Sequence, residues 1–339
     1  MDRLATLKQH IDLAHGRGLE IGPLVSPLVT RDEGEVYYVD RATTEELREW
    51  FSRDPKIDPS KILEVDFVWG EKTLAQASAG KMPFDYVVAS HVLEHVPDMI
   101  GWLNEVIEVL RPGGRLGLIV PDRRYTFDLR RRPSDIAELV EANLLRLRRP
   151  APRATFDHFY RHVDVDTAAI WRGERGHPDP PMRLSETMES VARALRADEY
   201  VDTHCWVFSD LEFAEMLRLL MASGLLDLRL VSITPTRVNE FEFFVTLERP
   251  DGPSDDDQRW QANAASVPDV RKLALEQNGV AGTTPAPLDQ RDGPALIEQL
   301  ERANASLAAE IATLRGTASW RVTAPLRRLH ALLNKRVSG

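Results

Sequence analysis

Cysteine is nearly absent from this sequence, which contains a single one, Cys205. An internal disulfide therefore cannot form, and an isolated thiol of this kind is usually packed as a small apolar side chain. No stretch approaches the roughly 20 consecutive apolar residues that cross a membrane as a helix. The N-terminal segment MDRLATLKQHIDLAHGRG also lacks the apolar centre of a signal peptide. We therefore expect a cytoplasmic protein.

Lysine is scarce as well: it supplies seven of the 43 basic residues, and the net charge of the 339-residue chain is -10. This charge disfavours nucleic acid as the main partner, because a polyanion requires an extended basic surface. The arginines instead gather locally, as in RRYTFDLRRRP at 123–133. Such a segment is either a solvated face or a contact for an anionic substrate, and the aromatic residues within it favour a substrate contact.

The sequence also lacks the glycines of a dinucleotide-binding turn. In GLEIGPLVSPLV at 18–29, an apolar run ends at Glu20 and Gly22, as a buried strand does before a sharp turn. A pyrophosphate needs close backbone approach through G-x-G-x-x-G, but Leu24 and Ser26 stand where the second and third glycines are expected. The turn therefore argues against NAD.

Short apolar runs rich in β-branched residues alternate with helical patterns through the first half of the chain. The expected strands lie at 19–22, 35–40, 61–68, 84–92 and 114–122, and two further runs at 226–236 and 239–250 predict an antiparallel hairpin. The alternation predicts an α/β fold of the Rossmann-like, doubly wound type. Its sheet is mostly parallel and seven-stranded, with crossover helices and the hairpin at its end.

Two helices stand out from the periodicity. In the first, at 99–110, apolar residues recur on one face and RPGG ends the pattern. The second, at 209–224, begins with Ser209 as its N-cap, carries Glu212 at the capping-box position and stops at Gly224.

Changes in composition set the expected domain boundaries. The sheet-forming domain covers 1–249, and within it 123–208 interrupt the alternation as an inserted substrate cap. Residues 250–294 are rich in Pro, Gly, Asp, Gln and Ala, which is typical of a flexible linker. A short helix at 295–315 and a basic tail at 316–339 follow.

Polar side chains lie where the predicted strands end, at the edge where doubly wound sheets bind ligands. Besides Glu20 and Gly22, these ends supply Asp40, Asp66 and the adjacent Ser90 and His91. An acid ending the second strand can accept hydrogen bonds from both ribose hydroxyls. Because the first turn does not suit a pyrophosphate, we expect a ligand that contains adenosine without phosphates.

The ordered motifs LEIG, YYVD, EVDFV, FDYVVASHVLEHV and LRPGGRLGLIVPD resemble class I S-adenosylmethionine-dependent methyltransferases over residues 1–249. The most specific part is VLEHV followed by VLRPGG. Of that family's acidic and glycine-rich first motif, only Glu20 and Gly22 are present, and Pro23 fixes the turn. The resemblance implies S-adenosylmethionine as cofactor. It places Glu20 and Gly22 beside the methionine moiety, Asp40 on the ribose, and Asp66 and Phe67 around the adenine. Pro23, Ser90 and His91 complete the expected cofactor-binding residues, and His91, one residue past its strand, is expected nearer the methyl group.

Transfer of a methyl group to a hydroxyl requires a base or a metal to remove the proton. Histidine is the expected base, and the candidates are His91 after the fourth strand, His158 in the cap and His204 before the Ser209-capped helix. The oxygen ligands of a metal could come from Asp122, Asp157 and Asp164, but their spacing matches no metal motif. No residue is therefore assigned as a metal ligand, and dependence on a metal stays open.

The C-terminal segment GTASWRVTAPLRRLHALL resembles a short segment, Ser-Trp-Arg-x-Thr-x-Pro-Leu-Arg, at the ends of bacterial surface-glycan assembly proteins. The resemblance implies a sugar or glycan acceptor, glycan assembly enzymes as partners, and a location free in the cytoplasm or peripheral at the inner face of the membrane. Two alternatives stay open. One is a methyltransferase for a small metabolite, and the other is a scaffold in a glycan assembly complex that has the fold without the activity.

A heptad pattern in the helix at 295–315 predicts a homodimer through 297–314. Its a and d positions are Ile297, Leu300, Asn304, Leu307, Ile311 and Leu314. Isoleucine at a with leucine at d favours a coiled coil of two parallel helices, and a single asparagine at a favours the same state. The alternative is an amphipathic helix that folds back on its own domain.

Overall fold

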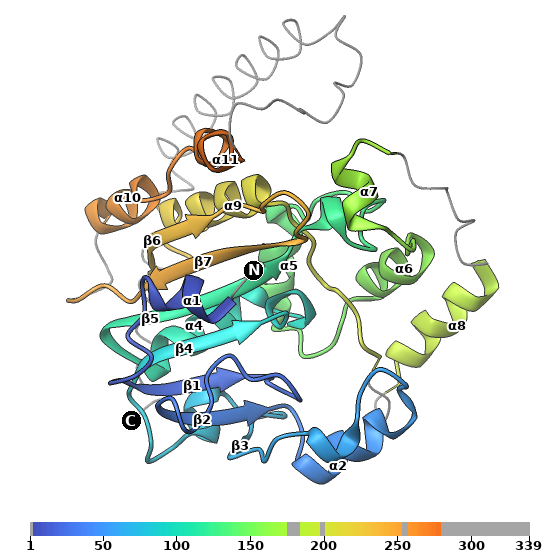
Figure 1. The fold of residues 1–339 in the computed structure, drawn as a ribbon, viewed down its shortest axis with the longest axis horizontal. Coiled ribbons are helices and arrows are strands. Elements are labelled where there is room, and N and C mark those ends of the chain that lie inside the picture. Colours follow the sequence, from blue (N-terminus) through green and yellow to red (C-terminus); the bar gives the residue numbers. More distant parts are fainter. Residues whose placement is uncertain (1–2, 175–183, 197–200, 253–256, 279–339) are drawn as a thin grey trace, which may run out of the picture. The chain divides into compact units, whose positions relative to one another are not determined.

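The strands form a seven-stranded sheet in the order β3-β2-β1-β4-β5-β7-β6 (Figure 1). The computed structural model describes residues 3–174, 184–196, 201–252 and 257–278, all within one compact unit. β1 to β5 are parallel, and β7 is antiparallel to both of its neighbours. The strands are β1 Arg17–Ile21, β2 Glu35–Asp40, β3 Phe67–Val68, β4 Phe84–Ser90, β5 Leu110–Pro121, β6 Arg229–Thr234 and β7 Glu242–Glu248. The predicted fold class, including the terminal hairpin, is confirmed.

Both faces of the central strands are buried, as expected of a parallel sheet. In β4, Val87 and Ala89 belong to the larger apolar core, whereas Tyr86 and Val88 belong to a second core on the opposite face. The larger core contains residues from α3 Leu74–Ala77, α4 Met99–Val109, α5 Ile136–Leu145 and α9 Asp210–Ala222. The second contains Leu7 from α1 Arg3–Lys8.

The two helices with clear sequence signals form as predicted. α4 begins after the Asp98 N-cap and ends at Val109, just before RPGG. α9 begins after Ser209, whose side chain accepts from the Glu212 N–H while the Glu212 side chain completes the capping box. It ends before Gly224, whose φ of +71° is the left-handed conformation that suits glycine after a helix.

Two expected strands have different bounds in the structure. β3 has two residues rather than the eight predicted, because the preceding residues contain a 3-10 helix, η2 Pro59–Lys61, and an irregular segment. β5 is longer than predicted: Leu110 already pairs with Phe84, and an irregularity in the register separates this pair from Tyr86 and Arg115.

A loop takes the place of the first expected crossover helix. Residues 22–34, all of which the structure describes, contain no helix between β1 and β2. The second crossover does contain α2 Thr44–Trp50, followed by η1 Phe51–Arg53. The turn after β1 therefore has no helix N-terminus behind it, which agrees with the absence of the dinucleotide-binding glycines.

The described part of the inserted cap is mainly helical. Figure 1 shows α6, α7 and α8 beyond the arrowheads of the parallel strands, at the carboxyl edge of the sheet. The cap contains α5 together with η4 Arg123–Tyr125, α6 Pro152–Tyr160, α7 Thr167–Trp171 and α8 Leu184–Ala194. α5 packs on α4, and α6 packs on α8. The described part of the insertion thus lies at the carboxyl edge of the sheet, and its role as a substrate cap stays a prediction.

The predicted linker at 250–294 is wrong for the part that the structure describes. α10 Asp257–Ala265 and α11 Val270–Asn278 both pack against α9 and β6. Arg259 forms an ion pair with Asp227 at 2.8 Å, and Asn263 donates to the same carboxylate at 3.1 Å. The segment was predicted to be a linker because its composition is polar. Two of its polar residues, Arg259 and Asn263, instead bind Asp227 of the domain. Residues 279–339, with the predicted heptads and basic tail, lie outside the described residues.

No membrane-spanning helix is found in the described part of the chain, where none is both long and apolar enough to cross a bilayer.

Candidate functional site

The turn after β1 depends on Gly22. Its φ of +65° is left-handed, and an added Cβ would come within 3.0 Å of the Val92 side chain. Its N–H donates to the Val39 carbonyl at 2.9 Å, which ties the end of β1 to the end of β2. Pro23 is buried immediately after it. Glycine is therefore needed both for the backbone conformation and for the close approach of the segment after β4.

Glu20 supports this turn from inside the protein. Its side chain is buried, and its two oxygens accept the backbone N–H groups of Leu28 and Val29 at 2.6 and 3.0 Å. Burial raises the pKa of Glu20 to about 7, although the two hydrogen bonds act in the opposite direction. The carboxylate therefore anchors the loop that replaces the crossover helix. This contact differs from the expected position beside a methionine moiety.

Asp40 lies at the carboxyl end of β2, where a ribose-binding acid was expected. Burial raises its pKa to about 6, and the hydrogen bond from the Arg41 N–H opposes this shift. That bond, at 2.7 Å, occupies Oδ1. Because the carboxylate is poorly hydrated, it gains strongly from additional hydrogen-bond donors. Its position and its partial desolvation both suit contact with ribose hydroxyls.

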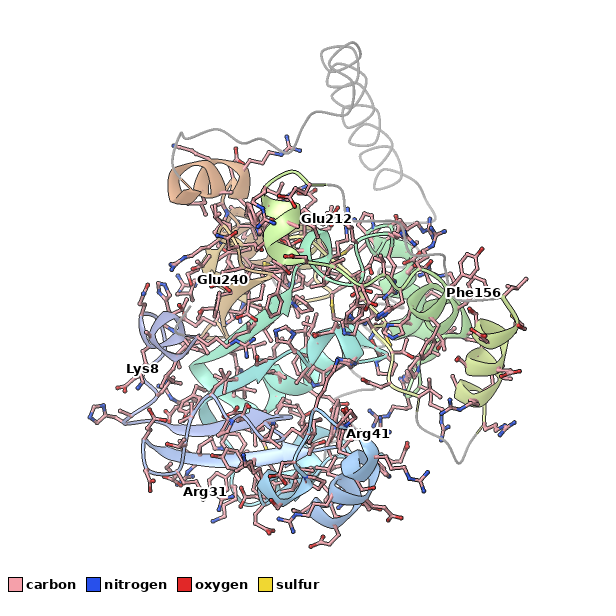
Figure 2. All side chains as sticks on the ribbon, turned by 45° about the vertical axis from the view of Figure 1, so that its right-hand side comes forward. Lys8, Arg31, Arg41, Phe156, Glu212 and Glu240 are labelled. Atoms are coloured by element: carbon pink, nitrogen blue, oxygen red, sulfur yellow. The ribbon has the colours of Figure 1, made fainter. Side chains whose placement is uncertain are left out.

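Asp66 and Phe67 lie beside β2, but Asp66 precedes β3 and Phe67 is its first residue, so Asp66 does not end a strand as expected. Asp66 Oδ2 accepts the Tyr38 N–H at 2.7 Å and pairs with Arg31 Nη2 at 2.9 Å. Phe67 stacks on Tyr37 with ring centroids 5.5 Å apart. Figure 2 labels Arg31 on the part of the molecule formed by the first three strands. Asp66 thus stabilises this part of the fold through its own contacts. The half-buried Phe67 ring is the better candidate for an adenine contact.

His91 follows Ser90, which ends β4 and is half-buried. The backbone of His91 is left-handed, with a φ of +53°. Its Nε2 lies 2.8 Å from Glu242 Oε2, and the same carboxylate pairs with Arg3 Nη2 at 2.6 Å. Both partners hold the pKa of Glu242 below its usual value despite burial. His91 is therefore fixed in an ion-pair network, which weakens its case as a free base.

His204 has the surroundings of an oriented imidazole. Its ring is 8% exposed, and Nδ1 lies 2.6 Å from Asp128 Oδ2. Asp128 is itself buried and accepts from Arg131 Nη1 at 2.9 Å. Burial alone would raise the pKa of Asp128, but His204 and Arg131 outweigh it and lower the pKa to about 2. The ionised carboxylate holds the ring by Nδ1, so that Nε2 is the nitrogen left for chemistry.

His158, which belongs to the cap, lies beside His204. The backbone N–H of His204 donates to His158 Nδ1 at 3.2 Å. The ring proton of His158 is therefore on its Nε2. Burial, followed by the nearby charge of His204, lowers the pKa of His158 to about 3. His158 is therefore neutral at physiological pH. Phe127 contacts both rings, with centroids 5.7 Å from His158 and 4.7 Å from His204.

The short η3 helix, Leu93–His95, brings Glu94 and His95 to the same place. Glu94 is 2% exposed, and among the described residues neither of its carboxylate oxygens has a hydrogen-bond partner. Its backbone carbonyl accepts the N–H groups of Cys205 and Trp206, which fixes the segment after His204 against η3. Cys205 is buried, as predicted for a packed thiol, and burial raises its pKa to about 12.

His95 connects Glu94 to His204. Its Nε2 lies 3.9 Å from Glu94 Oε1, its Nδ1 lies 2.9 Å from Asp202 Oδ1, and its ring contacts that of His204 edge-on at 4.6 Å. Burial alone would lower the pKa of His95, but the carboxylates of Asp202 and Glu94 raise it to about 9. None of Glu94, His95 and Asp128 was selected as a site residue from the sequence. Their one sequence signal was their position beside strand ends.

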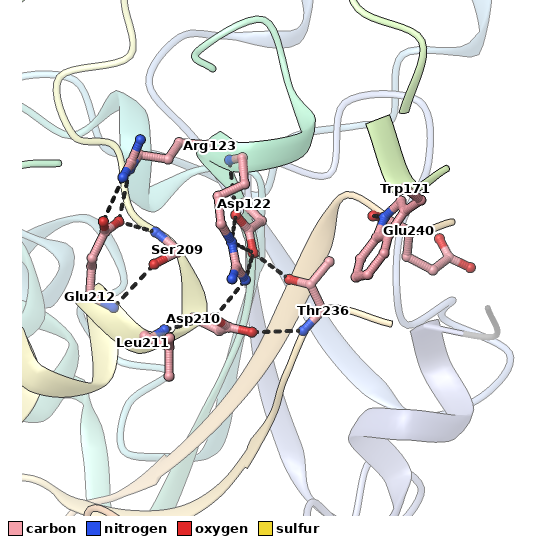
Figure 3. Close-up of polar contacts among 10 residues, drawn as sticks. Asp122, Arg123, Trp171, Ser209, Asp210, Leu211, Glu212, Thr236 and Glu240 are labelled. Atoms are coloured by element: carbon pink, nitrogen blue, oxygen red, sulfur yellow. Dashed lines mark hydrogen bonds and ion pairs between the residues drawn. The ribbon is translucent and has the colours of Figure 1, made fainter. Parts of the chain in front are cut away.

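The arginine segment at 123–133 is mainly structural, which corrects the expectation of a substrate contact. Figure 3 shows Arg123 paired with Glu212, and Asp122 and Asp210 in one network with Thr236. Arg123 Nη2 lies 2.6 Å from Glu212, and Arg124 Nη2 lies within 2.7 Å of both Asp122 and Asp210. The ion pairs between these carboxylates and the two guanidinium groups connect the end of β5, the cap and the start of α9.

The acids considered as metal ligands do not come together. Asp122 pairs with Arg124, Asp157 pairs with Arg131 and Arg161, and the Asp164 side chain is 96% exposed. Within the described ranges, two other sets of three residues have ligand atoms within 4.8 Å of one another. These sets are Glu94, His95 and His204, and Asp128, His158 and His204.

A family model described as a methyltransferase domain matches residues 11–219, from before β1 to within α9. The chain belongs to this methyltransferase family. S-adenosylmethionine is the cofactor that membership of the family implies. The comparison with curated proteins gives no match.

Solved structures with detectable similarity are also methyltransferases. The CcbJ methyltransferase from Streptomyces caelestis is 21% identical, with a TM-score of 0.26, and the match covers 37% of this chain and 54% of that chain. A methyltransferase from Methanosarcina mazei is 13% identical over 73% and 98% of the two chains, with a TM-score of 0.35. The Burkholderia thailandensis 1,6-didemethyltoxoflavin-N1-methyltransferase is 15% identical over 74% and 77%, with a TM-score of 0.35. The chain thus spans about half the length of the first of these.

The residues at the strand ends fit S-adenosylmethionine. The left-handed Gly22 keeps side-chain atoms out of the turn after β1, and Asp40 offers a poorly hydrated carboxylate at the end of β2. When bound, the cofactor supplies an electrophilic methyl group. This chain would hold it by Asp40, by the Gly22 turn and by the ring of Phe67.

Proposed function

We propose that the chain is an O-methyltransferase that methylates a sugar hydroxyl during bacterial surface-polysaccharide biosynthesis. The observation that supports oxygen as the acceptor atom is the oriented His204 beside the cofactor edge. A sugar hydroxyl is a poor nucleophile until its proton is removed, and a buried imidazole held by a carboxylate is suited to accept that proton. The Arg131–Asp128–His204 chain of contacts has this arrangement.

The reaction forms one bond and breaks another. The acceptor oxygen attacks the methyl carbon, the carbon–sulfur electron pair returns to sulfur, and the hydroxyl proton passes to the cluster around His204. His158 lies beside this path as a neutral ring, because its pKa is lowered to about 3. The cap helices lie over the same edge, where they can exclude water from the reacting atoms.

The choice of a glycan rests on the C-terminal segment around SWRVTAPLR, which lies outside the described residues. The same segment supports glycan assembly enzymes as partners and a place at the inner face of the membrane. A methyltransferase for a small metabolite is the alternative, since the cluster around His204 would serve any hydroxyl. The third hypothesis, a scaffold without activity, is disfavoured by Asp40 and Gly22, which are suited to cofactor binding.

The decisive experiment compares surface glycans by mass spectrometry in cells with and without the gene. We expect one methyl group per repeating unit to disappear, and to return with the wild-type gene but not with His204→Ala. In vitro, His204→Ala should lower kcat by about 10²- to 10⁴-fold, as the loss of a general base does, with S-adenosylmethionine affinity unchanged. His162→Ala is the matched control, because this ring is 43% exposed and stacks on Phe127. Unchanged glycans together with turnover of a small metabolite would support the alternative.

A further inference from the structure

Glu94 is the most unusual ionisable residue in the described part of the chain. Its carboxylate is 2% exposed and has no hydrogen-bond partner there, although burying an unpaired carboxylate is costly. Two histidines flank it at ion-pair distance: His91 Nδ1 at 3.5 Å and His95 Nε2 at 3.9 Å. His91 already has a shorter contact with Glu242, at 2.8 Å. Glu94 is therefore a buried carboxylate that accepts no hydrogen bond and has only long ion-pair contacts with two histidines.

A carboxylate lies near Nδ1 of both imidazoles next to Glu94. His204 Nδ1 is hydrogen-bonded to Asp128 at 2.6 Å, and His95 Nδ1 has an ion-pair contact with Asp202 at 2.9 Å. Histidines that bind a metal by one ring nitrogen almost always donate the other N–H to a carboxylate, a carbonyl or water. His204 has this arrangement, which leaves its Nε2 as the ligand atom, and the Asp202 contact favours Nε2 as the ligand atom of His95. Both rings lie beside the Glu94 carboxylate, which accepts no hydrogen bond in the described part of the chain.

We propose that Glu94, His95 and His204 bind a divalent transition-metal ion. Their ligand atoms already lie within 4.8 Å of one another, so that small side-chain movements would bring them to metal–ligand distances of about 2.0–2.2 Å. Two imidazoles and one carboxylate suit zinc or iron more than magnesium or calcium, which prefer oxygen ligands alone. Three protein ligands leave a coordination position open to an oxygen of a substrate or of water.

The second set of three residues is a weaker site. Asp128 is already hydrogen-bonded to both His204 and Arg131, and His158 Nδ1 accepts a hydrogen bond from the backbone N–H of His204. Asp128 therefore acts as the outer partner of His204 instead of as a ligand. In the metal-bound state His204 Nε2 would be a ligand and could not itself accept the proton; the cation would instead lower the pKa of a hydroxyl at its open position, and the proton would leave to water. Only this catalytic role rests on the proposed function; metal binding itself does not.

The test is metal binding by the full-length protein, purified without a histidine tag and treated with a chelator. Zinc and cobalt are then added separately, and the stoichiometry is measured by elemental analysis and by titration of the visible cobalt absorption. We expect one equivalent per chain and the intense absorption of low-coordinate cobalt with histidine ligands. Absence of stoichiometric binding, or the weak absorption of fully hydrated cobalt, would overturn the proposal.

Variants separate the ligands from their surroundings. Asp128→Asn should weaken zinc binding by about 10- to 100-fold, as the loss of an outer partner does, and Glu94→Gln should weaken it more. His162→Ala should bind zinc as the wild type does. If Glu94→Gln binds zinc with wild-type affinity, the site is wrong. If that variant does not fold, as judged by circular dichroism, the wild-type cobalt spectrum and Asp128→Asn decide the question.

Metal binding and methyl transfer can fail independently. Stoichiometric zinc in a protein that neither binds S-adenosylmethionine nor transfers its methyl group would keep the metal site and refute the proposed function. Methyl transfer by a chain that binds no metal, at a rate unaffected by chelation, would keep the proposed function and refute the metal site.

Discussion

Asp40 shows at the scale of one residue how the environment adapts a side chain to its ligand. A carboxylate in water has little to gain from a ribose, because water already satisfies its lone pairs. Asp40 is half-buried, and this burial raises its pKa to about 6. Two hydroxyl donors would therefore stabilise the ionised form, whereas the protonated form accepts them poorly.

We predict that S-adenosylmethionine affinity decreases as the pH falls through about 6. The folded pKa of Asp40 is raised, so the carboxyl takes up a proton below that pH, and binding then requires its release at a cost of up to tenfold in affinity per pH unit. Asp40→Asn should bind at least about tenfold more weakly, because a hydrogen bond to a charged group contributes about 1.5–3 kcal/mol. Its affinity should also change little with pH. Calorimetry from pH 5 to 8 measures both effects, and equal pH profiles for the two proteins would contradict the assignment. NAD, the control ligand, should not bind.

The sequence predicted the position of a residue correctly where that position depends only on the end of a strand or the start of a helix. Asp40 is the last residue of β2, and His204 precedes the capped α9, so both could be expected at the ligand edge. The roles of Glu20 and Glu94 could not be predicted, because they depend on burial and on partners distant in the sequence. The arginines were misinterpreted for the same reason: Arg123 pairs with Glu212, 89 residues away.

At the scale of elements, the strongest local signals gave correct predictions and the weak ones did not. The capping box of α9 and the order of the strands were both visible in the sequence. The polar composition of 250–294 hid α10, whose ordering depends on contacts with Asp227 and α9 rather than on its own periodicity. Likewise, the loop at 22–34 depends on the buried Glu20, which no local pattern reveals.

We predict that Gly224→Ala destabilises the domain more than Gly80→Ala does. Both glycines have positive φ, of +71° and +84°, so both substitutions cost about 1–2 kcal/mol in backbone strain. At Gly80 nothing lies within 4 Å of an added Cβ, whereas at Gly224 the Trp260 ring of α10 lies at 2.6 Å. Gly224→Ala must therefore also shift the Trp260 ring that packs here, and we expect at least about 1 kcal/mol beyond the control.

Urea unfolding of both variants measures this difference. In a Trp260→Ala background the extra cost of Gly224→Ala should disappear, because the clash is removed. Equal destabilisation by the two glycine variants would show that α10 does not pack on α9 in solution.

At the scale of the whole molecule, the carboxyl edge of the sheet collects residues that are far apart in the sequence. Glu94 and His95 come from the segment after β4, Asp128 from the segment after β5, and His204 from the segment before α9. Their convergence follows from the parallel topology, since successive strands end at one edge. The topology was predictable from the sequence, but which of these side chains touch one another was not, because the cap between β5 and α9 has no repeating pattern.

The predicted homodimer through 297–314 also belongs to this scale. Fewer than three heptads form a seam too short to be stable alone, so dimerisation should require neighbouring segments or contacts between domains. The chain should be compared with a form that ends after residue 278, because a cut after 250 would also remove α10 and α11, which pack on α9 and β6. By sedimentation we expect the full-length chain to be a dimer and the truncated chain a monomer.

A substitution within the full chain tests the seam itself. Leu307→Lys places a charge at a d position, where a partner helix would bury it, and should produce monomers. Ala309→Lys adds the same charge at the outer f position, two residues further on, and should leave the dimer intact. A full-length protein that sediments as a monomer, or a Leu307→Lys variant that dimerises as well as Ala309→Lys, would favour the alternative in which the helix folds back on its own domain.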